Sequence, residues 1–185
     1  AIDPYSPICG MIARFEPFKD HFNLLNALEM LKERREFSCI LVGSDITSEN
    51  KLLVNKIKEK KKENNIILAG PIEEVNLYMS GIDIHILSSL DESFPNVIAE
   101  AMICGTPCVA TDVGDTKMML SDLGWLCPPK NPYLLCESIF CSLTDYFDQK
   151  TSIKESHQAK CQAFILENFS FSKMLCSFNK AWFME

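Results

Sequence analysis

Short apolar runs alternate along the chain with longer stretches in which apolar residues recur every three or four positions. The short runs are typical of strands buried on both faces, and the longer spacing is typical of helices that cover them. The predicted strands occupy residues 8–13, 38–42, 65–69, 82–87, 106–110 and 124–127. This alternation predicts an α/β fold, a Rossmann-like parallel six-stranded sheet with helices on both faces and strand order 3-2-1-4-5-6.

Capping residues locate several of the helices. Asp20 precedes a helix that carries leucines at helical spacing, and the pair Asn131-Pro132 opens another. Pro95 is expected in the first turn of the helix that stops at Gly105. The remaining helices are predicted at about 48–63, 75–79, 152–167 and 170–183.

This pattern divides the chain into three segments. Residues 1–7 are a lead-in, either native or left from cloning, residues 8–150 are the sheet domain, and residues 151–185 are two C-terminal helices. The last helix is more apolar than a terminal helix usually is when it faces water. Its apolar residues are Phe171, Met174, Leu175, Phe178, Trp182 and Phe183. Either it is the last core helix of this domain, or its apolar face is available to another domain or to a second copy of the chain.

Composition narrows the class of protein. The chain has 185 residues, 47% of them hydrophobic, and a net charge of −7. A core of that size argues against global disorder, and the negative charge argues against sequence-independent nucleic-acid binding. No apolar run approaches the roughly 20 residues that span a bilayer, and the first six residues contain no secretory signal.

The cysteines and histidines do not form a metal pattern. Nine cysteines are scattered singly, none with Cys-x-x-Cys spacing, and the three histidines lie far apart. An odd number of cysteines within apolar runs is typical of buried free thiols in a reducing compartment. We therefore expect a cytoplasmic protein with no bound metal.

In parallel sheets, ligands bind beyond the carboxyl ends of the strands, so the loops after Ala13, Val42, Ala69, Leu87 and Ala110 are candidates. The loop after Ala13 carries two cations, Arg14 and Lys19. A guanidinium fork and an ammonium point charge could together hold a diphosphate. A surface loop held by salt bridges is an equally good interpretation of this spacing.

The loop after Leu87 leads into a helix with two glutamates, Glu92 before its start and Glu100 in its second turn. The free backbone amides of the first turn, from Ser93 to Val97, would form an anion site. A carboxylate can accept hydrogen bonds from two neighbouring hydroxyls, which suits a ligand with a sugar at each end of a diphosphate. Alone, a capping glutamate and an exposed helical glutamate explain the pattern better.

The loop after Ala110, residues 111–115, is a glycine-containing turn, which either borders a nucleotide or is simply tight. No strand is followed by Gly-x-Gly-x-x-Gly, which argues against a nicotinamide or flavin site. The chain also lacks a P-loop and a Gly-x-Ser-x-Gly nucleophile elbow.

Several motifs in order resemble those of one enzyme family. They are GMIAR at 10–14, ILVG at 40–43, ILAG at 67–70, ESFPNVIAEAM at 92–102 and GTPCVATDVG at 105–114. The chain resembles the C-terminal, donor-binding domain of GT-B glycosyltransferases, specifically the retaining family 4, over about residues 8–143. Within the fourth motif, seven residues separate the two glutamates, as in that family.

The resemblance implies roles for individual residues. Arg14 and Lys19 would stabilise the leaving diphosphate, Glu92 would hold the transferred sugar, and Glu100 would hold the ribose. The donor, linked to UDP or GDP, would also meet Ser93, Phe94, Pro95, Asn96 and Val97 at its phosphates and sugar, and Gly70, Pro71 and Ile72 at its base. The resemblance implies no cofactor beyond this substrate and no metal.

The chain departs from the family pattern in places. Ser93 and Asp45 stand where glycine is common, and Asp115 and Met118 replace a second glycine and a glutamate, which leaves the base and sugar open. The N-terminal domain that would supply the acceptor site is missing, so we expect this chain alone to be inactive.

The stretches Lys19-Asp20-His21 and Asp112-Val113-Gly114-Asp115 resemble those of bacterial enzymes that build O-antigen and other surface polysaccharides. Those enzymes use lipid-linked acceptors at the inner face of the cytoplasmic membrane, which implies a peripheral membrane contact for the full-length protein. A nucleotide-sugar 2-epimerase and a non-catalytic nucleotide-binding module are the alternatives.

Overall fold

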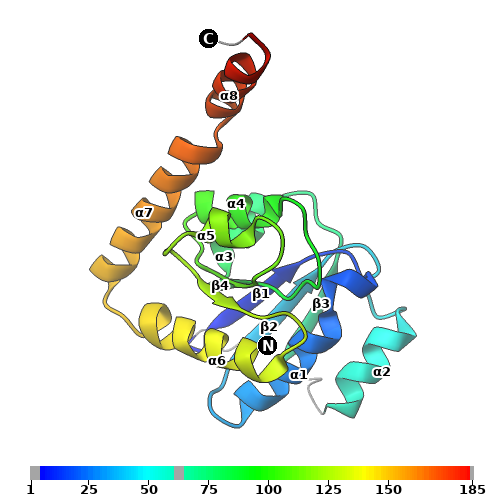
Figure 1. Ribbon diagram of the computed structural model, residues 1–185. Coiled ribbons are helices and arrows are strands. Elements are labelled where there is room, and N and C mark those ends of the chain that lie inside the picture. Colours follow the sequence, from blue (N-terminus) through cyan, green and yellow to red (C-terminus); the bar gives the residue numbers. More distant parts are fainter. Residues whose placement is uncertain (1–4, 61–64, 184–185) are drawn as a thin grey trace.

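The strand order of the sheet reverses beside its first strand. In the computed structural model, which describes residues 5–60 and 65–183, six parallel strands are arranged β3-β2-β1-β4-β5-β6 (Figure 1). They are β1 (Ile8–Ile12), β2 (Ser38–Val42), β3 (Ile66–Gly70), β4 (Ile84–Leu87), β5 (Cys108–Thr111) and β6 (Trp125–Cys127). Gly10 of β1 is in register with Ile40 of β2 on one side and His85 of β4 on the other. The predicted sheet and its order are confirmed.

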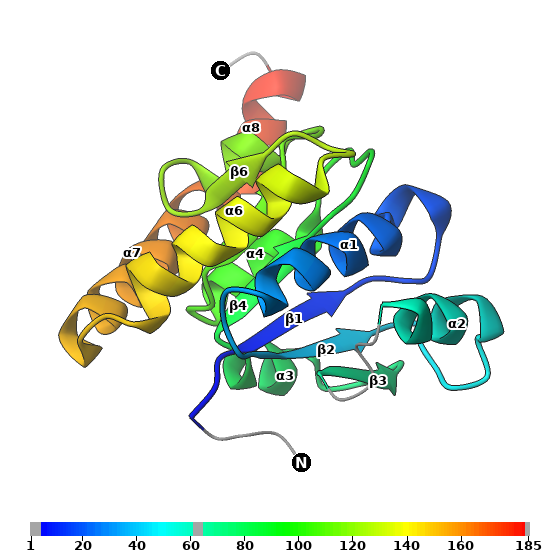
Figure 2. The same ribbon diagram turned by 90° about the horizontal axis from the view of Figure 1, so that it is seen from below.

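Helices cover both faces of this sheet (Figures 1 and 2). The helical elements are η1 (Pro17–Lys19), α1 (His21–Lys32), α2 (Lys51–Glu59), α3 (Val75–Gly81), α4 (Asn96–Ile103), α5 (Thr116–Leu120), α6 (Pro132–Ser142), the π-helical η2 (Leu143–Phe147), α7 (Thr151–Phe169) and α8 (Phe171–Phe183). Helices α1, α2 and α6 pack on one face, while α3, α4 and α5 pack on the other, where α7 lies against α4.

The apolar strand residues divide between two core clusters because successive side chains of a strand point to opposite faces. In β1, Cys9 and Met11 are buried in the cluster under α1 and α6. Ile8 and Ile12 pack against the cluster under α3, α4 and α7. Burial on both faces is what the continuous apolar runs predicted.

Helix starts follow the capping signals, with two corrections. Asp20 accepts a hydrogen bond from the Asn23 amide at 3.2 Å, and Asn131 accepts one from the Leu134 amide at 3.0 Å. Pro95 is the residue before α4 rather than in its first turn. Helix α2 begins at Lys51, not near Ser48, because the Asn50 side chain caps the Leu53 amide.

The end predicted for that helix, near residue 63, lies outside the described residues, and the short helix α5 was not predicted. At the other end of the chain, α7 is longer than predicted, reaching Phe169 instead of residue 167.

The last helix does not pack on the sheet. Helix α8 extends beyond α7, away from the domain (Figure 1), and Phe171 and Trp182 are 69% and 77% exposed. Met174, Leu175 and Phe178 are exposed as well. The interpretation of α8 as a core helix of this domain is therefore wrong. Over the described residues, no helix combines the length and apolarity needed to cross a membrane.

Two buried histidines make the fold sensitive to acid. Burial lowers the pKa of His85, at the centre of β4, to about 3, and that of His21, at the start of α1, to about 4. The unfolded chain binds these protons from about pH 6.5 downward, whereas the folded chain resists them until much lower pH. The free energy of unfolding should therefore fall as the pH drops below 6.5.

We expect each histidine to cost about 2 kcal/mol of stability at pH 5 relative to pH 7.5. Urea unfolding at the two pH values measures this loss, and His85→Leu should reduce it by about 2 kcal/mol. The remainder comes from His21 and from the half-buried His157, whose pKa burial also lowers. An unchanged pH dependence in His85→Leu would contradict the assignment.

Candidate functional site

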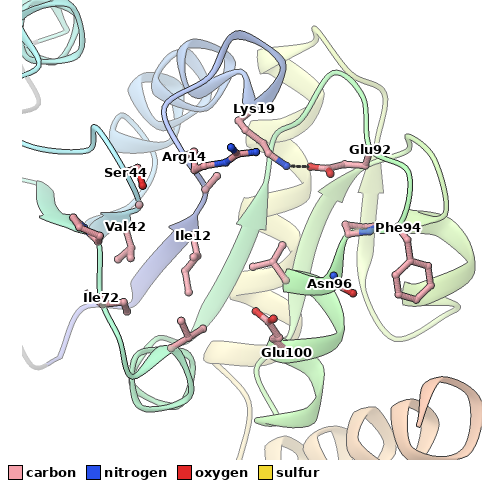
Figure 3. Close-up of a pocket in the computed structure, with 16 residues that line it drawn as sticks. Ile12, Arg14, Lys19, Val42, Ser44, Ile72, Glu92, Phe94, Asn96 and Glu100 are labelled. Carbon is pink, nitrogen blue, oxygen red and sulfur yellow. Dashed lines mark hydrogen bonds and ion pairs between the residues drawn. The ribbon is translucent and has the colours of Figure 1, made fainter. Parts of the chain in front are cut away.

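A cleft of about 480 Å³ opens at the carboxyl ends of the strands, where the strand order reverses (Figure 3). One wall consists of the loops after β1, β2 and β3, and includes Arg14, Lys19 and Ser44. The other wall is the segment from Glu92 to Glu100, which enters α4. The volume is within the range of pockets that hold small molecules.

The two walls are joined by an ion pair. Lys19 Nζ lies 2.6 Å from Glu92 Oε1, and the two side chains are only 17% and 11% exposed. Arg14, in contrast, is 65% exposed and pairs with its neighbour Glu16 at 2.9 Å. The salt-bridged surface loop therefore describes Arg14, while Lys19 belongs to a partly buried pair that spans 73 positions of the sequence.

The start of α4 faces the same cleft. Pro95, the residue before the helix, makes no side-chain capping hydrogen bond, and its carbonyl accepts from the Ile98 amide at 2.9 Å. Asn96 and Val97 line the cleft, and Glu100 projects into it one turn later (Figure 3). Amides at a helix start attract anions, since they combine unpaired N–H groups with the positive end of the helix dipole.

Aromatic contacts connect the segment from Glu92 to Glu100 to helix α7. The rings of Phe94 and Phe169 meet edge to face, with centroids 5.8 Å apart. Phe169, the last residue of α7, makes a similar contact with Phe164. The segment that carries Glu92 is thus fixed to α7 as well as to α4.

The turn at 111–115 contacts the backbone of the same segment at Glu92 and Ser93. The Asp115 amide donates to the Ser93 carbonyl at 3.1 Å. Gly114 has a φ of +52°, and a Cβ there would lie 1.8 Å from the Glu92 carbonyl oxygen. Of the two interpretations of this turn, a tight structural turn is the one that the contacts favour.

Comparison with known proteins is consistent with this geometry. The family model for glycosyl transferases group 1 matches residues 6–145. The chain belongs to the group 1 glycosyltransferases.

A relative of this glycosyltransferase chain is the putative glycosyltransferase EpsF of Bacillus subtilis (strain 168), 32% identical over 110 residues, which cover 57% of this chain and 27% of EpsF. A glycosyltransferase from Rickettsia africae ESF-5 has a similar structure, with a TM-score of 0.82 and 26% identity over 95% of this chain and 47% of that one. The structure of Anabaena Alr3699/HepE in complex with UDP-glucose matches with a TM-score of 0.77 and 26% identity, over 89% of this chain and 45% of that one.

The structural neighbours are GT-B glycosyltransferases, so the predicted fold family is confirmed. The chain spans less than half the length of these structures and about a quarter of EpsF.

Most of the predicted site residues of this glycosyltransferase chain line one cleft. They are Arg14, Lys19, Glu92, Glu100, Phe94, Pro95, Asn96, Val97, Pro71 and Ile72. Ser93 and Gly70 are not among the lining residues described: the Ser93 carbonyl binds Asp115, and Gly70 turns the chain at the end of β3, where its amide donates to the Ile46 carbonyl at 3.0 Å.

The cleft also contains residues that we did not predict. They are Ile12, Ala13, Val42, Gly43, Ser44 and Val75. The signal for most of them was their place at the carboxyl ends of β1 and β2. Within residues 5–60 and 65–183, no group of three His, Cys, Asp or Glu side chains could hold a metal ion.

The close contact at Gly114 is testable. We expect Gly114→Ala to lower the free energy of unfolding by about 2–4 kcal/mol, because the new Cβ would overlap the Glu92 carbonyl and the φ is left-handed. Urea denaturation measures the loss. Gly81→Ala is the matched control, since a Cβ at Gly81 would meet nothing within 4 Å, and equal stability of the two variants would contradict the argument.

Proposed function

We propose that the cleft binds the nucleotide-diphosphate sugar donor of a retaining family 4 glycosyltransferase, which transfers the sugar to a glycan or lipid-linked acceptor. The observation that carries the proposal is the meeting of two cations, a helix start and two carboxylates in one cleft. This combination suits a diphosphate flanked by two sugars, since cations and amides bind phosphate and carboxylates accept hydrogen bonds from sugar hydroxyls. The complex of HepE with UDP-glucose supports a UDP-linked donor, with GDP as the alternative base.

In this proposal, Lys19 and Arg14 bind the diphosphate and stabilise the charge that develops as it leaves. The backbone amides of Phe94, Asn96 and Val97 bind the same phosphates and the sugar. Glu92 holds hydroxyls of the transferred sugar, and Glu100 holds the ribose hydroxyls. The donor is a substrate, and the proposal requires no cofactor or metal.

Ile72 lies across the cleft from Glu100 (Figure 3). Together with Pro71, which lines the same cleft, it would provide apolar surface for the base. With the ribose on Glu100 and the base beside Ile72, the diphosphate reaches Lys19 and the sugar reaches Glu92. Catalysis then consists mainly of positioning and of electrostatic help to the leaving nucleotide.

The Lys19–Glu92 pair would change partners when the donor binds. Without donor, each side chain neutralises the other in a partly buried position. Bound phosphate would give Lys19 a second anion, and the sugar hydroxyls would give Glu92 neutral donors. The negative phosphates would therefore compensate Lys19 while Glu92 binds the sugar.

The proposal includes partners outside this chain. A second, acceptor-binding domain of the same protein would complete the active site and cover the apolar face of α8. We place the whole enzyme in the cytoplasm, at the inner face of the membrane, in bacterial surface-polysaccharide synthesis of the O-antigen type.

Calorimetric titration of this chain with UDP, GDP, UDP-glucose, UDP-N-acetylglucosamine and GDP-mannose tests the proposal. We expect one base series to bind and the other not. As a control, Glu36→Ala should bind like the wild-type chain, because residue 36 precedes β2 at the amino end of that strand, whereas the cleft lies at the carboxyl ends. Absence of binding in both series would overturn the proposed function.

The two glutamates should differ in their kinetic effects in the full-length enzyme. Glu92→Ala should lower kcat by about 100-fold and raise donor KM by no more than about tenfold, because contacts to the transferring sugar strengthen in the transition state. Glu100→Ala should mainly raise donor KM, by about tenfold, since it removes a ribose contact. Equal effects, or none, from both would contradict these roles.

The exposed face of α8 should make this chain associate. Light scattering should show concentration-dependent dimers for residues 1–185 and monomers for a chain that ends at Ser170, which retains the Phe169 contact. A donor-consumption assay with a lipid-linked acceptor should show no steady turnover by either. A monomer at all concentrations, or steady turnover, would contradict the respective expectation.

A further inference from the structure

Two adjacent serines at the carboxyl end of β4 lie beneath the cleft. Ser88 and Ser89 are fully buried, and neither is among the residues that line the cleft. The Ser88 hydroxyl bonds to the wall that carries Lys19, and the Ser89 hydroxyl bonds to the wall that carries Glu92. A buried hydroxyl has lost its water, so its bonds to protein are retained and fix the geometry of their acceptors.

Ser88 holds the wall that carries the cations. Its Oγ donates to the carbonyls of Lys19 and Asp20, at 2.9 and 3.1 Å. The Leu90 amide donates to the Phe18 carbonyl at 2.7 Å and ties the same loop from the next turn of chain. The backbone from which Lys19 reaches the cleft is thus attached to β4.

Ser89 holds the opposite wall. Its Oγ donates to Glu92 Oε1 at 2.6 Å, and its own carbonyl accepts from Thr111 Oγ1 at 2.6 Å. The Lys19 ammonium binds the same Oε1. Both bonds fall on one carboxylate oxygen, so Oε2 is left outside this pair of contacts and can accept from a ligand.

We propose that Ser88 and Ser89 are positioning residues, which set the Lys19 and Glu92 walls of the cleft from one strand end. The inference rests on the proposed function, because it assigns Lys19 to the diphosphate and Glu92 to the transferred sugar. Ser88 acts through the backbone of the phosphate-binding loop. Ser89 selects the carboxylate orientation in which Oε2 meets the sugar.

The two serines should therefore affect different parts of the donor. Loss of the Ser88 hydroxyl releases the Lys19 loop, so it should weaken nucleoside diphosphate and nucleotide sugar by the same factor. Loss of the Ser89 hydroxyl frees the Glu92 carboxylate, so it should weaken only the nucleotide sugar. A hydrogen bond to a charged group corresponds to about a tenfold change in affinity.

Titration of this chain with UDP and UDP-glucose, or with GDP and GDP-mannose if the wild-type chain binds that series, tests the assignment. Ser89→Ala should bind the nucleotide sugar about tenfold more weakly and the nucleotide within about twofold of wild type. Ser88→Ala should bind both about fivefold to tenfold more weakly. Ser80→Ala is the control, because its exposed hydroxyl binds only the Asn76 carbonyl of its own helix among the contacts described.

The outcomes separate the inference from the proposed function. A wild-type chain that binds neither series refutes the proposed function. A wild-type chain that binds, with Ser89→Ala weakening both ligands equally or neither, refutes the positioning role. Thermal unfolding checks each variant, and Ser89→Cys, which retains a weak donor of similar size, should recover part of the lost affinity if Ser89→Ala does not fold.

Discussion

The reversal of strand order between β1 and β4 is the constraint on which the site depends. The chain runs from β1 through β2 to β3 on one side, then crosses to β4 and continues through β5 to β6 on the other. Loops after β1 and β4 therefore turn away from each other and leave a crevice that no connection covers. Lys19 and Glu92 come from these two loops, so their ion pair spans the crevice.

The side chains of the cleft are held by successive layers beneath them. Ser88 and Ser89 fix the backbone of one wall and the carboxylate of the other. Gly114 allows the turn after β5 to touch the Glu92 backbone. Preorganisation of this kind lowers the cost of ordering charged groups when a ligand binds.

Local signals in the sequence predicted much of the fold and of the site. Asp20 and Asn131 marked helix starts because their capping bonds lie within three residues. The two glutamates were assigned to the site only through the resemblance to the family motif, since their spacing alone favoured a capping and an exposed helical glutamate. The contacts of Ser88 and Ser89 could not be predicted in this way. Ser88 meets a carbonyl 69 positions away, and only the packed sheet brings the two together.

The sequence left two alternatives open for α8 for a similar physical reason. Apolar spacing predicts an amphipathic helix and identifies its apolar face, but it does not indicate which domain or chain covers that face. The extended backbone of Ser170, with φ −68° and ψ 156°, separates α8 from α7, so the chain leaves the domain there instead of folding back on the sheet. Since Phe169 packs on Phe94 just before this break, the boundary between the described core and the uncovered helix lies beside the cleft itself.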